Sequence, residues 1–259
     1  MVENGKWALI TGATAGIGES FSRLLAAKGF NLVLVARDLP RLTERAAALE
    51  VNYKIETKII QADLATDAGC QRIESFVTEN EVEVLINNAG FGINKSFLVS
   101  DMKTEQEMFD VLVRTPMRIM HAILPKMIER DSGTLINVSS VAAWIAGGTY
   151  SASKSYLTVL SESLHTELAN TNVKVSVLAP GFTRTEFHQR GRMKMGALPN
   201  FMWLNSDALV KKAWSDSQKG SALSVPGWQY LVLSTFLRFG PRPLIRKLGM
   251  KVRVRQRNK

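Results

Sequence analysis

The sequence predicts an α/β fold built on a single doubly wound parallel sheet with helices on both faces, followed by a basic, amphipathic C-terminal extension. Short apolar runs alternate with segments of helical periodicity from residue 6 to residue 226. The runs are continuously apolar, as expected for strands covered on both faces. All acidic residues lie before residue 217, so the bases after that point account for the net charge of +10. We therefore expect one domain at 1–226 and an extension at 227–259.

Each helix and strand is predicted from features of the nearby sequence. The first strand is an apolar run that ends in Thr-Gly, and the helix after it stops at Gly29. Pro40 suits the first turn of the next helix, and Ser206 suits the N-cap of the last one. In order, the expected strands are 6–12, 30–37, 54–64, 82–90, 133–140, 173–181 and 222–227, and the expected helices are 16–29, 39–50, 67–80, 104–130, 149–169 and 206–220.

The composition of the chain indicates its cellular compartment. The chain has 259 residues, of which 46% are hydrophobic, enough for a sizeable core. Its single cysteine, Cys70, excludes an internal disulfide and favours a reducing compartment. The N-terminus has no basic segment followed by an apolar run, and no uncharged apolar run reaches the roughly 18 residues that span a bilayer. These features predict a cytoplasmic protein.

The turn after the first strand reads TGATAGIG, with glycines at 12, 16 and 18. A strand that leads through such a turn into a helix presents backbone N–H groups at the helix N-terminus, where a pyrophosphate binds. We therefore expect a dinucleotide site here, although the spacing differs from G-x-G-x-x-G and a glycine-rich turn without ligand is the alternative. The turn's expected cofactor contacts are Gly12, Thr14, Ala15, Gly16, Ile17 and Gly18.

The end of the second strand indicates which dinucleotide is preferred. NAD-binding folds place an acid about 20 residues after the glycines, but that position is Ala36, followed by Arg37. A guanidinium suits a 2′-phosphate, so the sequence favours NADP(H). Asp38 follows at once and leaves the register open by one residue, and a solvated Arg37 is the alternative.

Six motifs then follow in order: TGATAGIG, ADL at 62–64, NNAG at 87–90, NVSS at 137–140, YSASK at 150–154 and PGFTRT at 180–185. Over roughly residues 5–225 this order resembles the short-chain dehydrogenase/reductase family, and the tail resembles a bacterial subgroup of general oxidoreductases. The resemblance implies a Rossmann-like fold and NADP(H)-dependent hydride transfer between the nicotinamide and a carbonyl or alcohol.

The resemblance also implies the catalytic residues Ser140, Tyr150 and Lys154. Tyr150 would be the general acid, and Lys154 lies one helical turn further on the same face. A cation ~4–5 Å from the phenol favours phenolate by roughly 3–4 kcal/mol at an effective dielectric near 20. Ser140 would orient the substrate, with Ser139, on the other side of the strand, as the alternative. Without the upstream motifs, a Tyr–Lys pair four residues apart would be an ordinary helical pair.

The same resemblance assigns further cofactor contacts. Asp63 and Leu64 match the positions that contact adenine, and Lys154 would bind the nicotinamide ribose beside Tyr150. The segment that backs the cofactor ribose corresponds to Asn88, Ala89 and Gly90, and the loop near the carboxamide to Pro180, Gly181, Phe182 and Thr183.

Two departures weaken the enzymatic expectation. Leu112 occupies the position where the family usually has an asparagine that holds a water in a proton relay. The segment from Ser140 to Tyr150 is also about three residues shorter than the resemblance implies. The alternative is a catalytically weak or inactive nucleotide-binding regulatory or scaffold protein on the same fold.

The segment at 188–203 predicts the substrate class. It is rich in apolar side chains that suit a hydrophobic carbonyl or alcohol, namely Met193, Met195, Leu198, Phe201, Met202 and Trp203. Four bases, Arg184, Arg190, Arg192 and Lys194, are spaced to meet an acidic group such as a coenzyme A phosphate. A solvated loop is the alternative.

The extension combines apolar and basic residues. One predicted helical face consists of Trp228, Leu231, Val232, Phe236 and Phe239. Such a segment suits an anionic membrane surface, the domain itself or a second subunit, and the end at 251–259 is predicted to be disordered. We expect a homo-oligomer, as is common in the family, and no nucleic acid partner. We expect no metal, because His121, His165 and His188 have no ligand spacing.

Overall fold

A computed structural model describes residues 5–187, 191 and 198–257, and within them the chain forms one parallel sheet of seven strands. The strand order is β3-β2-β1-β4-β5-β6-β7, so the direction of winding reverses between β1 and β4. Ligands of such folds bind beyond the carboxyl ends of the strands at this reversal. The strands are β1 Trp7–Thr11, β2 Asn31–Ala36, β3 Thr57–Gln61, β4 Val84–Asn87, β5 Gly133–Val138, β6 Val173–Leu178 and β7 Leu223–Ser224.

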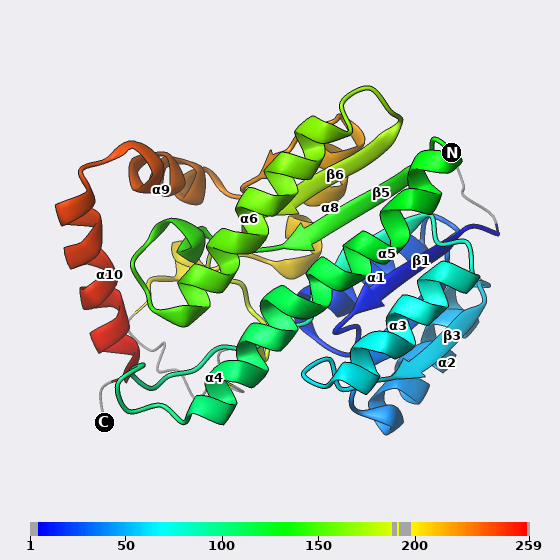
Figure 1. The fold of residues 1–259 in the computed structure, drawn as a ribbon, viewed down its shortest axis with the longest axis horizontal. Coiled ribbons are helices and arrows are strands. Elements are labelled where there is room, and N and C mark those ends of the chain that lie inside the picture. Colours follow the sequence, from blue (N-terminus) through cyan, green and yellow to red (C-terminus); the bar gives the residue numbers. More distant parts are fainter. Residues whose placement is uncertain (1–4, 188–190, 192–197, 258–259) are drawn as a thin grey trace.

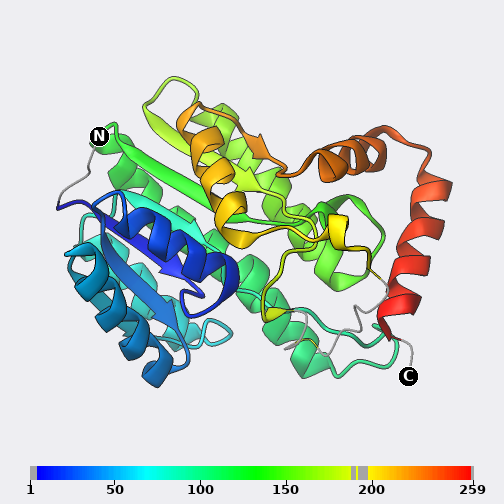
Figure 2. The same cartoon turned by 180° about the vertical axis from the view of Figure 1, so that it is seen from behind.

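Helices cover both faces of the sheet, which confirms the doubly wound prediction (Figures 1 and 2). Alternate residues of β1 serve opposite layers, since Ile10 packs in the core beneath α1 and Leu9 in the core beneath α5. This explains why the strands are apolar at every position. One layer contains α1 Gly16–Ala26, α2 Leu39–Tyr53 and α8 Ser206–Gln218, and the other contains α3 Asp67–Glu79, α5 Thr115–Glu129 and α6 Thr149–Glu167.

The single helix expected at 104–130 is interrupted. It consists of α4 (Met102–Phe109), a π-helical turn (Asp110–Arg114) and α5. In the π turn the Thr115 N–H donates to the Asp110 carbonyl, and Pro116 has no N–H for the carbonyl of Leu112. The helical periodicity of the sequence does not reveal this interruption, and Leu112 of the π turn lines the small cavity described below.

Two helices form the C-terminal extension, α9 (Trp228–Phe239) and α10 (Arg242–Arg257). The prediction of disorder at 251–259 was therefore wrong up to Arg257. A short 3₁₀ turn, Val141–Trp144, follows β5, and another, Asn200–Met202, precedes α8.

Tyr230 attaches α9 to the core. Its side chain is fully buried, its hydroxyl donates to the Met202 carbonyl at 2.6 Å, and it accepts from the Phe182 N–H at 3.0 Å. A Cβ at Gly181 would lie 2.1 Å from the Tyr230 ring, so only glycine leaves room for this contact. The extension is thus packed on the loop that follows β6.

Candidate active site

A groove of about 1040 Å³ lies at the reversal of the sheet. Of the residues predicted for cofactor binding and catalysis, all line it except Gly18. These residues lie at or after the carboxyl ends of strands β1 to β6 and at the start of α6. They are Gly12, Thr14, Ala15, Gly16, Ile17, Arg37, Asp63, Leu64, Asn88, Ala89, Gly90, Ser140, Tyr150, Lys154, Pro180, Gly181, Phe182 and Thr183.

The glycine turn leaves room for an anion at the start of α1. Gly12 and Gly16 have φ values of +68° and +58°. The N-cap of α1, Ala15, makes no side-chain capping bond, so the first N–H groups of the helix remain available to a ligand. A Cβ at Gly18 would lie 2.2 Å from the Gly12 carbonyl oxygen, so this glycine serves helix packing. The turn therefore fits a pyrophosphate.

Asn88 holds this turn in place by hydrogen bonds. Its amide nitrogen donates to the carbonyls of Thr11 at 2.9 Å and Gly12 at 3.2 Å. The Thr11 hydroxyl in turn accepts from the backbone N–H groups of Asn88 and Ala89, each at 3.0 Å. The NNAG motif thus fixes the geometry of the glycine turn as well as lining the groove.

Arg37 and Asp38, which follow β2, both line the groove. Asp38 caps α2, because its carboxylate accepts from the Arg41 N–H at 3.1 Å. Arg37 is exposed and lines the groove. The Arg41 guanidinium makes two bonds to the Glu186 carboxylate, at 3.1 and 2.8 Å, and so connects α2 to the loop after β6 across the groove.

The two serines after β5 have different hydrogen-bond partners. The Ser139 hydroxyl is buried and bonds the Lys154 carbonyl at 2.9 Å and the Thr158 hydroxyl at 2.7 Å. The Ser140 hydroxyl donates to the Pro180 carbonyl at 3.5 Å, accepts from the Ala142 N–H at 3.1 Å and lies near enough to Tyr150 to lower its pKa. The shortened segment between Ser140 and Tyr150 therefore still brings the two side chains together.

Tyr150 and Lys154 differ from the expected electrostatics. Desolvation raises the pKa of Tyr150 to about 12, against a smaller lowering by the bond to Ser140. Desolvation also lowers the pKa of Lys154 to about 7. The Lys154 amine donates to the Val138 carbonyl at 2.6 Å and lies 5.9 Å from the centroid of the Tyr150 ring. The expectation of a phenol made acidic by Lys154 is therefore wrong for the protein without cofactor, because burial disfavours both charges.

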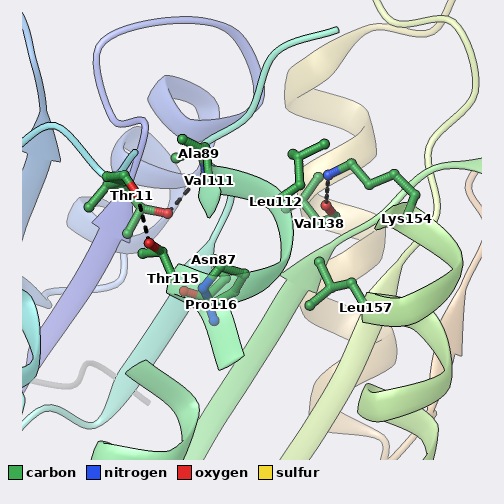
Figure 3. Close-up of a pocket in the computed structure, with 11 residues that line it drawn as sticks. Thr11, Asn87, Ala89, Val111, Leu112, Thr115, Pro116, Val138, Lys154 and Leu157 are labelled. Carbon is green, nitrogen blue, oxygen red and sulfur yellow. Dashed lines mark hydrogen bonds between the residues drawn. The ribbon is translucent and has the colours of Figure 1, made fainter. Parts of the chain in front are cut away.

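A small cavity lies directly beneath this pair. Its volume is about 10 Å³, which suits a single water molecule. Lys154 and Leu112 line it side by side (Figure 3). A Cβ at Gly90 would lie 2.7 Å from the Leu112 side chain and 3.9 Å from the Lys154 amine. Gly90, Leu112 and Lys154 therefore lie close together. The other lining residues are Thr11, Leu64, Asn87, Ala89, Val111, Thr115, Pro116, Val138 and Leu157.

The sequence profile of the short chain dehydrogenase family matches residues 6–195. The chain belongs to this family. It is therefore an oxidoreductase with a nucleotide-binding fold, and the resemblance drawn from the six motifs is confirmed.

Named relatives of this short chain dehydrogenase include two fungal very-long-chain 3-oxoacyl-CoA reductases. The one from Phaeosphaeria nodorum is 33% identical over 270 residues, which cover 98% of this chain and 78% of the relative. The one from Scheffersomyces stipitis is 30% identical over 247 residues, 89% of this chain and 71% of the relative.

Solved structures of similar proteins share the fold along nearly the whole chain. A short-chain dehydrogenase from Sphingobium yanoikuyae in complex with NADPH is 27% identical, with a TM-score of 0.84 and 98% of each chain covered. A bulky-bulky ketone specific alcohol dehydrogenase from Comamonas testosteroni is 25% identical, with a TM-score of 0.79, 99% of this chain and 97% of that chain covered.

In this short chain dehydrogenase the far end of the groove is apolar. Leu198 and Met202 of the predicted substrate segment line it, whereas Phe201 is exposed. Of the other residues predicted there, Met193, Met195, Arg190, Arg192 and Lys194 lie outside the described residues. Trp203 stacks near Phe182 with ring centroids 6.2 Å apart, and Arg184 bonds the Asn200 side chain at 3.1 Å.

Sequence reasoning missed part of this wall. Tyr230, Leu233 and Leu237 of α9 line the groove, as do Leu248 and Gly249 of α10. No local motif marks them, because their role depends on how α9 packs on the loop after β6. Within the part of the chain that the structure describes, no helix is long and apolar enough to cross a membrane.

Proposed function

We propose that this enzyme is an NADP(H)-dependent reductase of hydrophobic carbonyl compounds, with Tyr150 as the general acid. The observation that carries the proposal is the convergence of Ser140, Tyr150 and Lys154 on a groove that also contains the glycine turn. Both carbonyl reduction and the reverse alcohol oxidation use the same groups.

Each residue has a role set by its surroundings. Bound NADPH would supply the hydride that adds to the carbonyl carbon. With a pKa of about 12, Tyr150 keeps its proton at neutral pH and donates it to the carbonyl oxygen. The Ser140 hydroxyl donates to the same oxygen as negative charge develops there. Lys154, with a pKa of about 7, exchanges protons near neutrality, and we infer that it restores the proton of Tyr150.

Residues of this chain would hold the cofactor in a defined order. The pyrophosphate fits the N-terminus of α1 at Gly16, the adenine fits beside Asp63 and Leu64, and the ribose next to the nicotinamide fits between Asn88 and Lys154. Pro180, Gly181, Phe182 and Thr183 would contact the carboxamide.

Arg37 supports NADP(H) over NAD(H). Both residues line the groove, but one oxygen of the Asp38 carboxylate is engaged in capping α2, whereas the Arg37 guanidinium suits a 2′-phosphate. Removing a charged hydrogen bond costs roughly 1.5–3 kcal/mol, so Arg37→Ala should raise the KM for NADPH about 10- to 100-fold. The KM for NADH should change little. Steady-state kinetics with both cofactors tests this, and equal effects on both would contradict the assignment.

The substrate proposed is a 3-oxoacyl thioester or a similarly apolar ketone. The relatives with the names given above act on very-long-chain 3-oxoacyl-CoA, and the substrate end of this groove is lined by Leu198, Met202, Leu233 and Leu237. Arg184 lies exposed at the same segment, where it would meet an acidic group of the thioester.

The decisive experiment is a substrate screen. The purified enzyme is incubated with NADPH or NADH and with 3-oxoacyl-CoA esters of increasing chain length, bulky ketones and aldehydes, and cofactor oxidation is recorded. Tyr150→Phe should lower kcat by roughly 10²–10⁴-fold. Tyr156→Phe, on the exposed side of the same helix, is the matched control.

The alternative function rests on Leu112, which removes the usual polar group beside Lys154. A regulatory or scaffold protein of little activity would bind NADPH but oxidise none across the panel, and Tyr150→Phe would change nothing. Homo-oligomerisation, a cytoplasmic location and the absence of nucleic acid partners remain predictions, tested by sedimentation of the purified protein and by fractionation of cells.

A further inference from the structure

The helix α9 has two apolar faces. Its inner face packs on the core through Tyr230 and Leu237, which are 0% and 2% exposed, and it lines the substrate end of the groove. Its outer face is turned to solvent and is made of large apolar side chains. These are Trp228 (75% exposed), Leu231 (56%), Val232 (64%), Phe236 (40%) and Phe239 (81%), and we call them the α9 outer face.

The spacing makes the α9 outer face continuous. Each member lies three or four residues from another member, so the set lies along one side of the helix. Single exposed apolar residues are common on soluble proteins, but a contiguous apolar strip marks an interaction surface.

Positive charge adjoins this strip. Arg242, Arg246 and Lys247 of α10 are exposed and follow Phe239 directly in the chain, with the exposed Leu244 (51%) among them. Every ionisable side chain after Asp216 other than Tyr230 is basic. Among the side chains of this stretch that the structure describes, Arg238 is near an acid, with its guanidinium 3.8 Å from Glu162. The surface is therefore apolar and cationic together.

The α9 outer face and the basic residues of α10 lie at one end of the molecule. In Figures 1 and 2, α9 and α10 form the end opposite to α2 and β3. The same two helices contribute Leu233, Leu237 and Leu248 to the wall of the groove. One side of α9 thus faces the substrate end of the groove while the other faces solvent.

We propose that the α9 outer face and the basic residues of α10 bind the surface of a membrane rich in anionic lipid. Apolar side chains enter the interface, and the arginines and lysine meet the lipid phosphates. The location would place the groove's apolar end next to the lipid phase. That consequence rests on the proposed hydrophobic substrate, whereas membrane binding itself does not.

Charge argues against a second copy of the chain as the occupant. A two-fold contact through this surface would set the same patch against itself and bring the basic residues of both copies together. Like charges across an interface cost free energy, whereas an anionic lipid surface compensates them.

The test is sedimentation of the full chain with vesicles, without cofactor or substrate. Vesicles of phosphatidylcholine and phosphatidylglycerol should bind the protein at least roughly tenfold more tightly than phosphatidylcholine alone, and high salt should weaken binding. The double variant Leu231→Glu/Val232→Glu and the triple variant Arg242→Glu/Arg246→Glu/Lys247→Glu should each lose most of it.

The matched control is Val51→Glu, which adds a negative charge at an equally exposed apolar position (68%) on α2, at the other end of the molecule. It should bind like the wild type. Circular dichroism and NADPH binding verify that each variant is folded. Quenching of tryptophan fluorescence by brominated lipids, absent in Trp228→Phe, gives a second readout that needs no charge change.

Three outcomes overturn the proposal: a wild type that stays in the supernatant, variants that bind as well as the wild type, or a dimer that Leu231→Glu/Val232→Glu dissolves while vesicles bind neither protein. The inactive Tyr150→Phe should still bind vesicles. An absence of reductase activity would therefore leave the membrane result intact, and the reverse also holds.

Discussion

Lys154 is almost completely buried, with 4% of its surface exposed, and its amine donates a hydrogen bond to the Val138 carbonyl. Burial without a carboxylate partner favours the neutral amine, which is why its pKa falls to about 7 from an ordinary 10.5. Tyr150 responds to the same surroundings by keeping its proton. Above pH 7 the free protein thus has a mostly neutral Lys154 beside a protonated Tyr150, which can donate its proton.

This titration makes stability depend on pH in a definite direction. Between pH 7 and 10.5 the unfolded chain keeps the Lys154 proton and the folded chain has lost it, so the free energy of unfolding should rise with pH. Below pH 7 Lys154 is protonated in both states, so it no longer makes the free energy of unfolding change with pH. Lys154→Met should remove the rise, as measured by urea unfolding from pH 6 to about 9.5, where Tyr150 is still protonated.

Lys103→Met, at an exposed site on α4, is the control and should leave the slope unchanged. A slope that persists in Lys154→Met would show that another group causes it.

Leu112 tests whether proton supply limits the reaction. Leu112→Asn would add a polar group to the wall of the cavity beside Lys154, where a bound water could pass protons onward. We expect kcat for carbonyl reduction to increase roughly tenfold. Leu112→Met keeps the volume without the amide, and equal kcat values in the two variants would contradict a relay through this cavity.

At the scale of elements, α9 is held by one buried tyrosine. The Tyr230 hydroxyl satisfies the Met202 carbonyl of the substrate segment and the Phe182 N–H of the loop after β6. The Tyr230 side chain thus joins α9 to the substrate segment and to the loop after β6, and it also lines the groove.

Tyr230→Phe should therefore destabilise the fold by about 1–3 kcal/mol, because it leaves a buried N–H and a buried carbonyl without partners. It should also raise the KM for the carbonyl substrate more than that for NADPH. Tyr156→Phe, whose hydroxyl meets only the Met117 sulfur in the described contacts, should change stability by less than about 0.5 kcal/mol. Urea unfolding compares the two, and equal losses would contradict the role of Tyr230.

At the scale of the molecule, cofactor and substrate ends of the groove come from different parts of the chain. Residues before 190 supply the glycine turn and the residues proposed to contact the ribose and to act in catalysis, whereas α9 and α10 supply much of the apolar end. The division at 226 is thus proposed to separate cofactor binding and chemistry from substrate enclosure.

Removal of residues 227–259 should accordingly preserve NADPH binding within a few-fold and abolish turnover of large hydrophobic carbonyl substrates, while lowering stability by the loss of the Tyr230 contacts. Fluorescence titration with NADPH and steady-state kinetics measure the two properties. Full activity of the shortened chain would show that the extension is not part of the substrate site.

Local sequence determined most of the fold and the cofactor half of the site. Apolar runs covered on both faces, the glycine turn and the six motifs each act over a few residues, so their order along the chain is enough to predict the sheet and the lining of the groove. The tertiary structure decided the rest. The pKa values of Tyr150 and Lys154 follow from burial, the position of Leu112 from a π turn, and the substrate wall from the packing of Tyr230 on Gly181. The pKa values and the substrate wall depend on contacts between distant segments, whereas the π turn depends on local hydrogen bonding between Thr115 and Asp110 that the helical periodicity does not reveal.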